Sequence, residues 1–286
     1  MCGEAPLYRP EDNTLHFVDP LYRPPRIYVV SLDHASVRTL ELEDNASVLC
    51  FRKNRAGYIA AYYQGIAYID ESGAMQILKE VFPSSQRHLK RFNDGAVDCK
   101  GRFWAGEIDL PALEKRVLAD HHPTGRLFRY DPDGTLTQHE TGIMCSNGIG
   151  WSPDNGKMYY NDSSSHVMYR YDFDLEHGTL SNRIIFVDKR QAGGNPDGLV
   201  VDTLGNVWTA IYGKGCVEGY SPEGQLIQTI PLPTKNSTCP GWAGKDLSMM
   251  FITSAENEDT DADASGAGDL FVAKGFAPGL PKFRFG

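Results

Sequence analysis

Side chains that carry oxygen recur in this chain at one position, just before short apolar segments. Asn93-Asp94-Gly95, Ser146-Asn147-Gly148 and Pro196-Asp197-Gly198 each precede alternating apolar residues, a glycine turn and a second apolar segment with an aromatic residue. Glu4 occupies a position of the same kind. Carboxylate and amide oxygens suit a hard divalent cation that keeps some water, such as calcium, magnesium or manganese, and zinc and iron(II) stay open as alternatives.

A turn is the other interpretation of these motifs. Asn-Gly and Asp-Gly pairs are also the commonest short turn signals, and each pair taken alone indicates a turn more often than a ligand. The functional interpretation gains weight because three such pairs enter equivalent segments and a carboxylate, Glu4, stands at a fourth.

The segments around these motifs predict the fold. Short alternating runs separated by turn sequences such as Asp131-Pro132-Asp133-Gly134 and Ser221-Pro222-Glu223-Gly224 indicate antiparallel hairpins. Six units of roughly 45 to 50 residues, each with about four strands, match the period of propeller blades. We therefore expect an all-β, six-bladed β-propeller that forms one domain over residues 1–286.

The sixth unit is one strand short. It contains only the segments 247–254 and 269–273, so a strand from before the first full blade, or a swap between the chain ends, is expected to close the ring. A short helical turn is expected within 110–122, and the acidic run 256–263 is expected to be a solvated loop.

Composition and charge narrow the class of protein. Of the 286 residues 41% are hydrophobic, which is enough for a sizeable core. The net charge of −9 and the absence of clustered Lys and Arg argue against nucleic-acid binding. No apolar run is long enough to span a membrane, and the start of the chain lacks the pattern of a signal peptide, so a cytoplasmic protein is expected.

Six scattered cysteines show no metal-binding spacing and are expected to be reduced and mostly buried. Cys145 stands out because it lies two residues before Asn147.

In a propeller the innermost strands line the central channel, so residues that begin these strands converge at one of its mouths. Glu4, Asn93, Asp94, Asn147 and Asp197 are therefore expected to meet there.

Four ordered motifs that span most of the chain resemble the regucalcin (senescence marker protein 30) and gluconolactonase family. They are Gly3-Glu4-Ala5-Pro6, Arg91-Phe92-Asn93-Asp94-Gly95 with Gly101-Arg102-Phe103-Trp104-Ala105-Gly106, Ser146-Asn147-Gly148-Ile149-Gly150-Trp151-Ser152, and Pro196-Asp197-Gly198-Leu199 with Gly205-Asn206-Val207-Trp208.

The resemblance implies a six-bladed propeller with one divalent metal ion in its channel that opens the ring of a small lactone. It implies Glu4, Asn147 and Asp197 as metal ligands, Asp197 also as the acid and base, and Arg91 and Asn93 as substrate contacts. We add Asp94 as a substrate contact. The partner is then a small molecule, and the protein a monomer or weak homodimer.

The chain departs from the family pattern at two places. The first motif continues to Tyr8 where the family usually has Trp, and the acid that touches the sugar in some relatives aligns near Pro111, with Asp109 and Glu107 as the close substitutes. We take Asp109 as a further substrate contact. Two alternatives stay open: the same scaffold acting on a hydrophobic lactone, an organophosphate or a biosynthetic intermediate, possibly without hydrolysis, or a non-catalytic metal-binding propeller.

Overall fold

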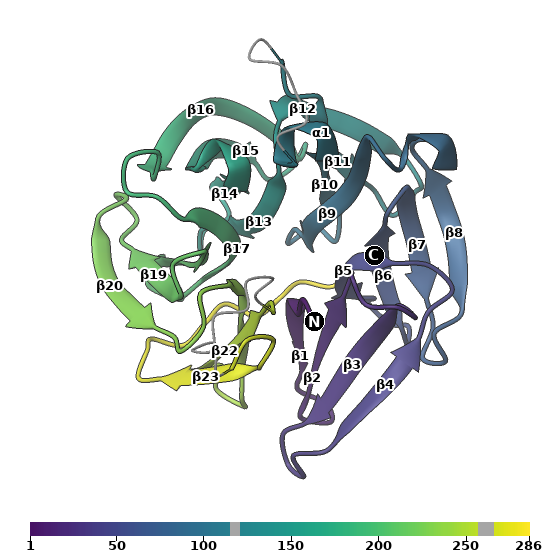
Figure 1. Cartoon of the computed structure of the whole chain (residues 1–286), viewed down its shortest axis with the longest axis horizontal. Coiled ribbons are helices and arrows are strands. Elements are labelled where there is room, and N and C mark those ends of the chain that lie inside the picture. The colour runs from purple at the N-terminus through teal and green to yellow at the C-terminus, as the bar shows by residue number, and fades with distance from the viewer. Residues whose placement is uncertain (115–120, 257–265) are drawn as a thin grey trace.

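The computed structural model describes residues 1–114, 121–256 and 266–286. Six antiparallel sheets stand as blades around a central channel, so the chain is the six-bladed β-propeller that the sequence predicts (Figure 1). Strands adjacent in the sequence are adjacent in every sheet, and the first strand of each blade lies innermost.

The six blades follow one another along the chain. The first three are β1 (Glu4–Arg9), β2 (Thr14–Asp19), β3 (Arg26–Ser31) and β4 (Val37–Glu41); β5 (Ala46–Phe51), β6 (Tyr58–Tyr62), β7 (Gly65–Ile69) and β8 (Met75–Glu80); and β9 (Lys90–Val97), β10 (Phe103–Asp109), β11 (Gly125–Tyr130) and β12 (Leu136–Ile143). The last three are β13 (Ser146–Trp151), β14 (Lys157–Asp162), β15 (Val167–Asp174) and β16 (Thr179–Asp188); β17 (Asn195–Val201), β18 (Val207–Tyr212), β19 (Cys216–Tyr220) and β20 (Leu226–Pro231); and β21 (Ser237–Ala243), β22 (Met249–Ser254) and β23 (Phe271–Lys274).

The sixth blade corrects the sequence-based expectation. Within the described residues it has three strands, and β21, which the sequence analysis missed, is its innermost one. Among the residues that the structure describes, neither an extra strand nor a swap between the chain ends closes the ring, because β1 to β4 form the first blade together. Pro240 and Gly241 make β21 resemble a loop in sequence. In the structure Gly241 faces β1, where a Cβ atom would lie 2.8 Å from the Pro6 carbonyl oxygen.

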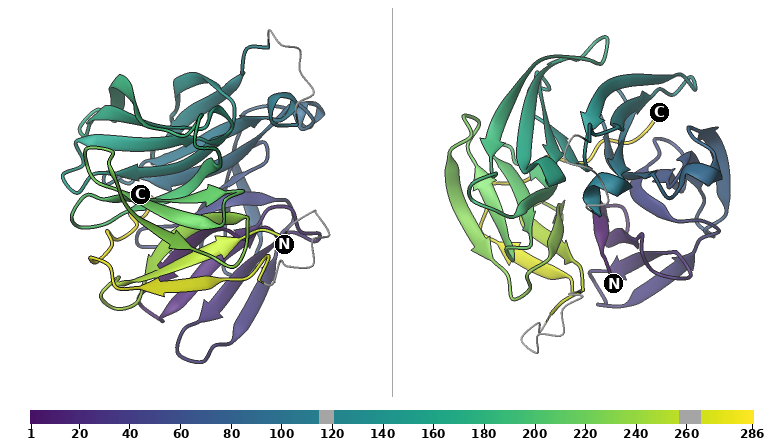
Figure 2. Two further views of the ribbon diagram at one scale, coloured as in Figure 1. Left: turned by 60° about the vertical axis from the view of Figure 1, so that its left-hand side comes forward. Right: turned by 45° about the horizontal axis from the view of Figure 1, so that its top comes forward.

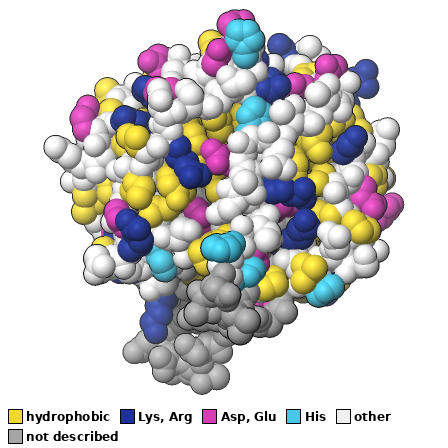
Figure 3. Space-filling view, turned by 90° about the horizontal axis from the view of Figure 1, so that it is seen from above, with side chains coloured by type: hydrophobic (Ala, Val, Ile, Leu, Met, Phe, Trp, Pro, Cys, Tyr) yellow, Lys and Arg dark blue, Asp and Glu magenta, His cyan; other side chains and the backbone are white. Residues whose placement is uncertain are grey.

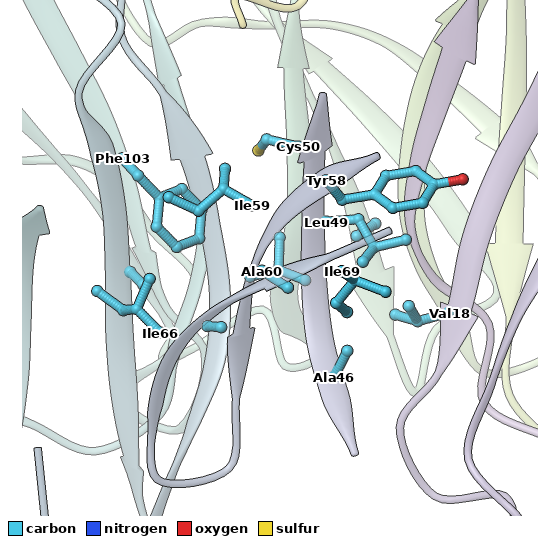
Figure 4. Packing of buried hydrophobic residues seen from close by; sticks show 14 of the residues in the cluster. Val18, Ala46, Leu49, Cys50, Tyr58, Ile59, Ala60, Ile66, Ile69 and Phe103 are labelled. Carbon is cyan, nitrogen blue, oxygen red and sulfur yellow. The ribbon is translucent and has the colours of Figure 1, made fainter. Parts of the chain in front are cut away.

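The core lies between neighbouring blades. All residues of β5 and β6 are buried, whereas β4 at the outer edge of the first blade is largely exposed. Figure 4 shows Val18 from the first blade and Leu49 and Ile59 from the second in one cluster with Phe103 from the third. Burying one such side chain stabilises the fold by about 1.5–3 kcal/mol, so contacts between blades fix the position of each innermost strand.

The C-terminal tail (residues 276–286) crosses one mouth of the channel and joins opposite sides of the ring. Leu280 N donates to Val201 O in the fifth blade (3.1 Å), and Phe285 N donates to Phe51 O in the second (2.9 Å). Figure 1 shows this yellow segment running from β23 towards β5, and Figure 2 shows it from two further sides. The tail therefore supplies a closure that does not use a strand swap.

Three further expectations concern segments outside the sheets. The short helix α1 (Leu110–Leu113) follows β10 as expected, but residues 115–120 lie outside the described part of the chain. Residues 257–265 of the acidic run and its surroundings also lie outside it. All six cysteines are free, as expected, and four of them are buried. Among the described residues, none of the helices has the length and apolar character needed to span a membrane.

Candidate metal and substrate site

A β-bulge in each innermost strand positions the candidate residues. The pairing with the second strand shifts between Glu4 and Leu7 in β1, between Ser146 and Ile149 in β13, and between Pro196 and Leu199 in β17. The innermost strands β5, β9 and β21 have register shifts as well. Because a bulge bends a strand and re-aims its side chains, the Asn-Gly and Asp-Gly pairs lie inside bulged strands rather than in hairpin turns.

The glycine after each polar residue permits close approach of neighbouring innermost strands. A Cβ atom on Gly148 would lie 2.5 Å from Leu199 N, and one on Gly198 would lie 2.2 Å from Cys239 Sγ. These distances are shorter than any van der Waals contact, so a side chain does not fit at either position. The recurring glycines therefore bring Asn147 and Asp197 together on adjacent strands.

Glu4 lies at the first residue of β1, and the segment before it is held by the sixth blade. Gly3 N donates to Ser254 O (3.0 Å), and the Thr238 hydroxyl donates to Gly3 O (2.6 Å). The Thr238 side chain is completely buried. These two hydrogen bonds to Gly3 and the pairing of Glu4 with Val18 in β2 hold the backbone of Glu4, although it lies near the start of the chain.

Asp197 has the most supported backbone of the candidate residues. Asn161 Nδ2 donates to Asp197 O (2.5 Å), the Thr209 hydroxyl donates to Gly198 O (3.1 Å), and the Ser163 hydroxyl donates to Pro196 O (2.6 Å). All three donors are buried and belong to neighbouring segments of the fourth and fifth blades. They hold the carboxylate in a fixed place at the channel.

The carboxylates of Glu4, Asp94 and Asp197 lie close enough to repel one another. Burial raises the pKa of Glu4 well above its usual range, and the charges of Asp197 and Asp94 raise it further, while Arg91 opposes the shift. Burial and the Asp94 charge likewise raise the pKa of Asp197, which a hydrogen bond with Asn147 opposes. Three carboxyl groups thus share one end of the channel, and a bound cation would stabilise their charged forms.

Two oxygen atoms at this place fit a cation. Asp197 Oδ1 and Asn147 Oδ1 are buried and have no hydrogen-bond partner within the protein. Buried polar atoms without partners are rare in native proteins and point to an ion or water. Among residues 1–114, 121–256 and 266–286 no group of three or more His, Cys, Asp or Glu side chains has metal-binding geometry. The candidate set of two carboxylates and one amide, from Glu4, Asp197 and Asn147, has the oxygen chemistry of a hard divalent cation.

Arg91 and Asn93 lie beside this set and contact each other. Arg91 Nη1 donates to Asn93 Oδ1 (3.0 Å), and Asn93 Nδ2 donates to the carbonyl oxygen of Ser146, the neighbour of Asn147 (2.9 Å). The Arg91 guanidinium carbon lies 5.1 Å from the centre of the Tyr63 ring. The structure therefore connects these two residues to the strand that carries Asn147.

Asp109 has a different environment from the other candidates. One of its oxygens accepts from Ala112 N (3.1 Å) at the start of α1, and the other accepts from His121 (2.8 Å) and from the backbone and hydroxyl of Thr124 (2.9 and 3.1 Å). These hydrogen bonds lower the pKa of Asp109 against the effect of burial. Both oxygens are engaged in holding the segment after β10, and a substrate contact by Asp109 stays a prediction. The nearby Glu107 is paired with Arg126 at 2.6 Å.

The sequence analysis missed Asp19 and Tyr63. Asp19 is 1% exposed; its Oδ1 accepts from Leu21 N and Tyr22 N, and its Oδ2 has no partner. The Tyr63 hydroxyl donates to Pro20 O (2.7 Å), so it holds the same segment while its ring lies against Arg91. Neither residue belongs to a repeated motif, and the sequence therefore gives no signal that would single them out.

Comparison with known proteins agrees with the fold and with the motifs. The family described as SMP-30/gluconolactonase/LRE-like region matches residues 2–256. A 6-deoxy-6-sulfogluconolactonase of Pseudomonas putida is 32% identical over 288 residues, which cover 100% of this chain and 95% of that protein. Pentonolactonase XacC of Haloferax volcanii is 29% identical over 296 residues, covering 99% and 94%.

A solved structure has the same architecture. A calcium-binding protein, regucalcin, of Agrobacterium tumefaciens superimposes with a TM-score of 0.85 at 25% identity, covering 99% of this chain and 94% of that one. The match therefore covers all six blades of the ring. The chain therefore belongs to the SMP-30/gluconolactonase/LRE-like family.

Proposed function

We propose that this protein is a lactonase that uses a divalent cation to hydrolyse small lactones of the sugar-lactone type. One observation carries the proposal: the oxygen-bearing side chains of Glu4, Asn147 and Asp197, on separate blades, lie near one another, and Asn147 and Asp197 each keep a buried oxygen without a partner. The names of the relatives, sulfogluconolactonase and pentonolactonase, support the substrate class.

Glu4, Asn147 and Asp197 are the residues that would hold the cation. A bound divalent cation supplies a positive charge that polarises a lactone carbonyl and lowers the pKa of bound water. Its identity among calcium, magnesium, manganese, zinc and iron(II) is left to experiment. The rigid support of the Asp197 backbone by Asn161 keeps the ligand set from rearranging.

Asp197 is the proposed acid and base. Its carboxylate accepts a proton from the water that adds to the lactone carbonyl carbon. As the bond between that carbon and the ring oxygen breaks, the same group returns the proton to the ring oxygen, which becomes a hydroxyl. The products are one hydroxy acid per lactone, with no group left on the protein. Burial of Asp197, which is 6% exposed, keeps bulk water from this proton.

Arg91, Asn93 and Asp94 are the proposed substrate contacts. The hydrogen bond between Arg91 and Asn93 and the Tyr63 ring fix the direction of the guanidinium group. A fixed, forked donor suits sugar hydroxyls or an anionic substituent. Asp109 holds the segment that follows β10 next to this group, and we retain it as the fourth candidate contact only for testing.

The proposal predicts loss of activity when the cation is removed. Protein treated with a chelator and desalted is expected to lose lactone hydrolysis in a pH-stat assay, and addition of one of the five cations is expected to restore it. Full activity in protein shown by elemental analysis to be free of metal would contradict the mechanism.

Asp197→Asn is expected to reduce kcat by at least about 100-fold, because the amide cannot move the proton. Asp188→Asn, on the exposed end of β16, is the matched control and is expected to retain wild-type rates. A panel of neutral, anionic and hydrophobic lactones, with an organophosphate ester, separates the proposed substrate class from the alternatives.

A further inference from the structure

Lys282 is the charged residue of the C-terminal tail that lies at the channel. The tail is fixed on both sides of it, by Gly279 N donating to Leu247 O (2.9 Å) and by Phe285, which is 4% exposed and accepts from Lys53 N (2.8 Å). These backbone contacts therefore fix the position of Lys282 at the mouth of the channel that the tail crosses, which we call the far mouth.

The interior of the channel has two levels below the candidate site. The upper level is a void of about 10 Å³, room for about one water molecule, and all six innermost strands contribute to its wall. The lower level is a cavity of about 90 Å³ at the far mouth, next to Trp151 and Val201. Lys282 lines both levels, and Asp94 lines the upper one. The ammonium-bearing side chain thus reaches from the far mouth towards the carboxylates.

Charge complementarity accompanies this geometry. Glu4, Asp94 and Asp197 place three carboxylates at one end of the channel. Burial raises the pKa of Asp94, a hydrogen bond from Gly95 N opposes that shift, and the positive charge of Lys282 opposes it as well. Lys282 also acts on the buried thiols of Cys50 and Cys239, whose pKa values burial raises. The charge of Lys282 therefore acts on Asp94 from the side of the tail, and the charge of Arg91 acts on Glu4.

We propose that Lys282 is a positioning residue that sets the cation affinity of the channel by placing a fixed positive charge beneath Asp94. This inference rests on the proposed function in taking Glu4, Asn147 and Asp197 as the cation ligands. The lysine offsets part of the carboxylate repulsion in the cation-free protein and repels the divalent cation in the loaded one. Both effects weaken cation binding. The Lys282 charge therefore reduces the difference in free energy between the cation-free and the cation-loaded protein.

The sign of the effect distinguishes this role from a structural one. Removing the lysine charge is expected to tighten cation binding, whereas loss of structure at a binding site loosens it. From Coulomb's law at an effective dielectric constant of roughly 20 to 40, reduced by the screening of the exposed Lys282 side chain by salt, the expected change is roughly 3- to 10-fold.

The test is calorimetric titration of calcium and of manganese into metal-free wild-type protein and into Lys282→Met. The variant is expected to bind the cation roughly 3- to 10-fold more tightly, with a difference that shrinks between 20 mM and 500 mM salt because salt screens the charge. Lys282→Arg, which keeps the charge, is expected to restore wild-type affinity. Lys274→Met, the same change on the exposed β23 strand, is the matched control and is expected to have no effect.

Every result of this titration either supports or overturns the proposed role of Lys282. Equal or weaker cation affinity in Lys282→Met, or tightening of equal size in Lys274→Met, overturns the role of Lys282 even if the wild-type protein hydrolyses lactones. A wild-type protein that binds none of the cations overturns the proposed function and the role of Lys282 together. A lactonase assay on the same samples therefore separates the two failures.

Discussion

At the scale of single residues, the candidate site contains side chains with oxygen atoms that accept no hydrogen bond within the protein. Asp197 and Asn147 keep a buried oxygen without a partner, whereas Asp109 uses both oxygens within the protein. The same residue types thus have different capacities for a ligand. That difference depends on which donors surround each carboxylate, and the residue type alone does not reveal it.

His16 gives a residue-scale prediction about pH. It is fully buried between the Tyr58 hydroxyl and the Thr14 hydroxyl (2.7 Å each), and burial, with the Arg9 charge, lowers its pKa from 6.5 to about 3. Below pH 6.5 the unfolded chain binds a proton that the folded protein does not, so folding stability is lost as the pH falls. Between pH 7.5 and 5.5 this costs about 1.4 kcal/mol.

Urea unfolding at the two pH values checks this. His16→Gln is expected to show a pH-dependent loss smaller than that of the wild type by about 1.4 kcal/mol, and His34→Gln, at an exposed histidine, is expected to behave as the wild type. An unchanged pH dependence in His16→Gln would show that His16 is not neutral in the folded protein at pH 5.5.

At the scale of strands, the bulges decide which side chains face the channel. Gly198 gives the test: its Cβ atom would lie 2.2 Å from Cys239 Sγ and 2.8 Å from the Cys239 backbone, so the neighbouring strand cannot yield by moving a side chain. Gly198→Ala is expected to lower the free energy of unfolding by about 2–4 kcal/mol, in the range of overpacked cores, and to weaken cation binding.

Gly156→Ala is the control for this substitution. The atoms nearest to its Cβ atom would be those of the Asp154 carboxyl group, at 3.4 Å or more, and the expected change in stability is within about 0.5 kcal/mol. Thermal unfolding and calorimetry on both variants separate close strand approach from a general cost of replacing glycine. A Gly198→Ala protein as stable as Gly156→Ala would mean that the inner strands are not closely packed at this level.

The sequence predicts the positions of the strands better than it predicts the bulges within them. Alternating apolar residues and Pro-Asp-Gly turns locate five blades and the strand entries of Glu4, Asn147 and Asp197, because these patterns are local. β21 is not apparent in the sequence because Pro240 and Gly241 are typical of loops. Gly241 fits an innermost strand because it packs against Pro6, which is distant in sequence. For the same reason the sequence could not distinguish an Asn-Gly turn from an Asn-Gly bulge, or identify Tyr63 under Arg91.

At the scale of the whole molecule, the site groups three carboxyl groups, those of Glu4, Asp94 and Asp197, whereas the face shown in Figure 3 mixes both charges. In Figure 3, which shows the molecule from above, acidic and basic side chains are interspersed with apolar and uncharged ones on the visible face. The ring is held by contacts between blades and by the tail, in which Phe285 stacks on Tyr130 with ring centres 5.9 Å apart. We propose that residues 1–286 form one domain that unfolds in a single transition.

Phe285→Ala tests this closure. Truncating a buried phenylalanine is expected to lower the free energy of unfolding by about 3–5 kcal/mol while the transition stays single. Phe283→Ala, at a residue that is 37% exposed, is expected to have a much smaller effect. Two separated transitions by differential scanning calorimetry in the wild type would show that groups of blades unfold independently.

The tail across the far mouth makes the channel a blind well and not a pore. The upper level of the channel, directly below the candidate site, is a void of about 10 Å³ with room for about one water molecule, so neither a hydrated ion nor a sugar passes through. The cation, the lactone and the product therefore enter and leave through the same mouth of the channel. The species that binds deepest has to enter first and leave last. With the proposed ligand set, the cation loads before the lactone, and a bound lactone or hydroxy acid slows its escape. Exchange of the ion is therefore expected to be slowest in protein saturated with product.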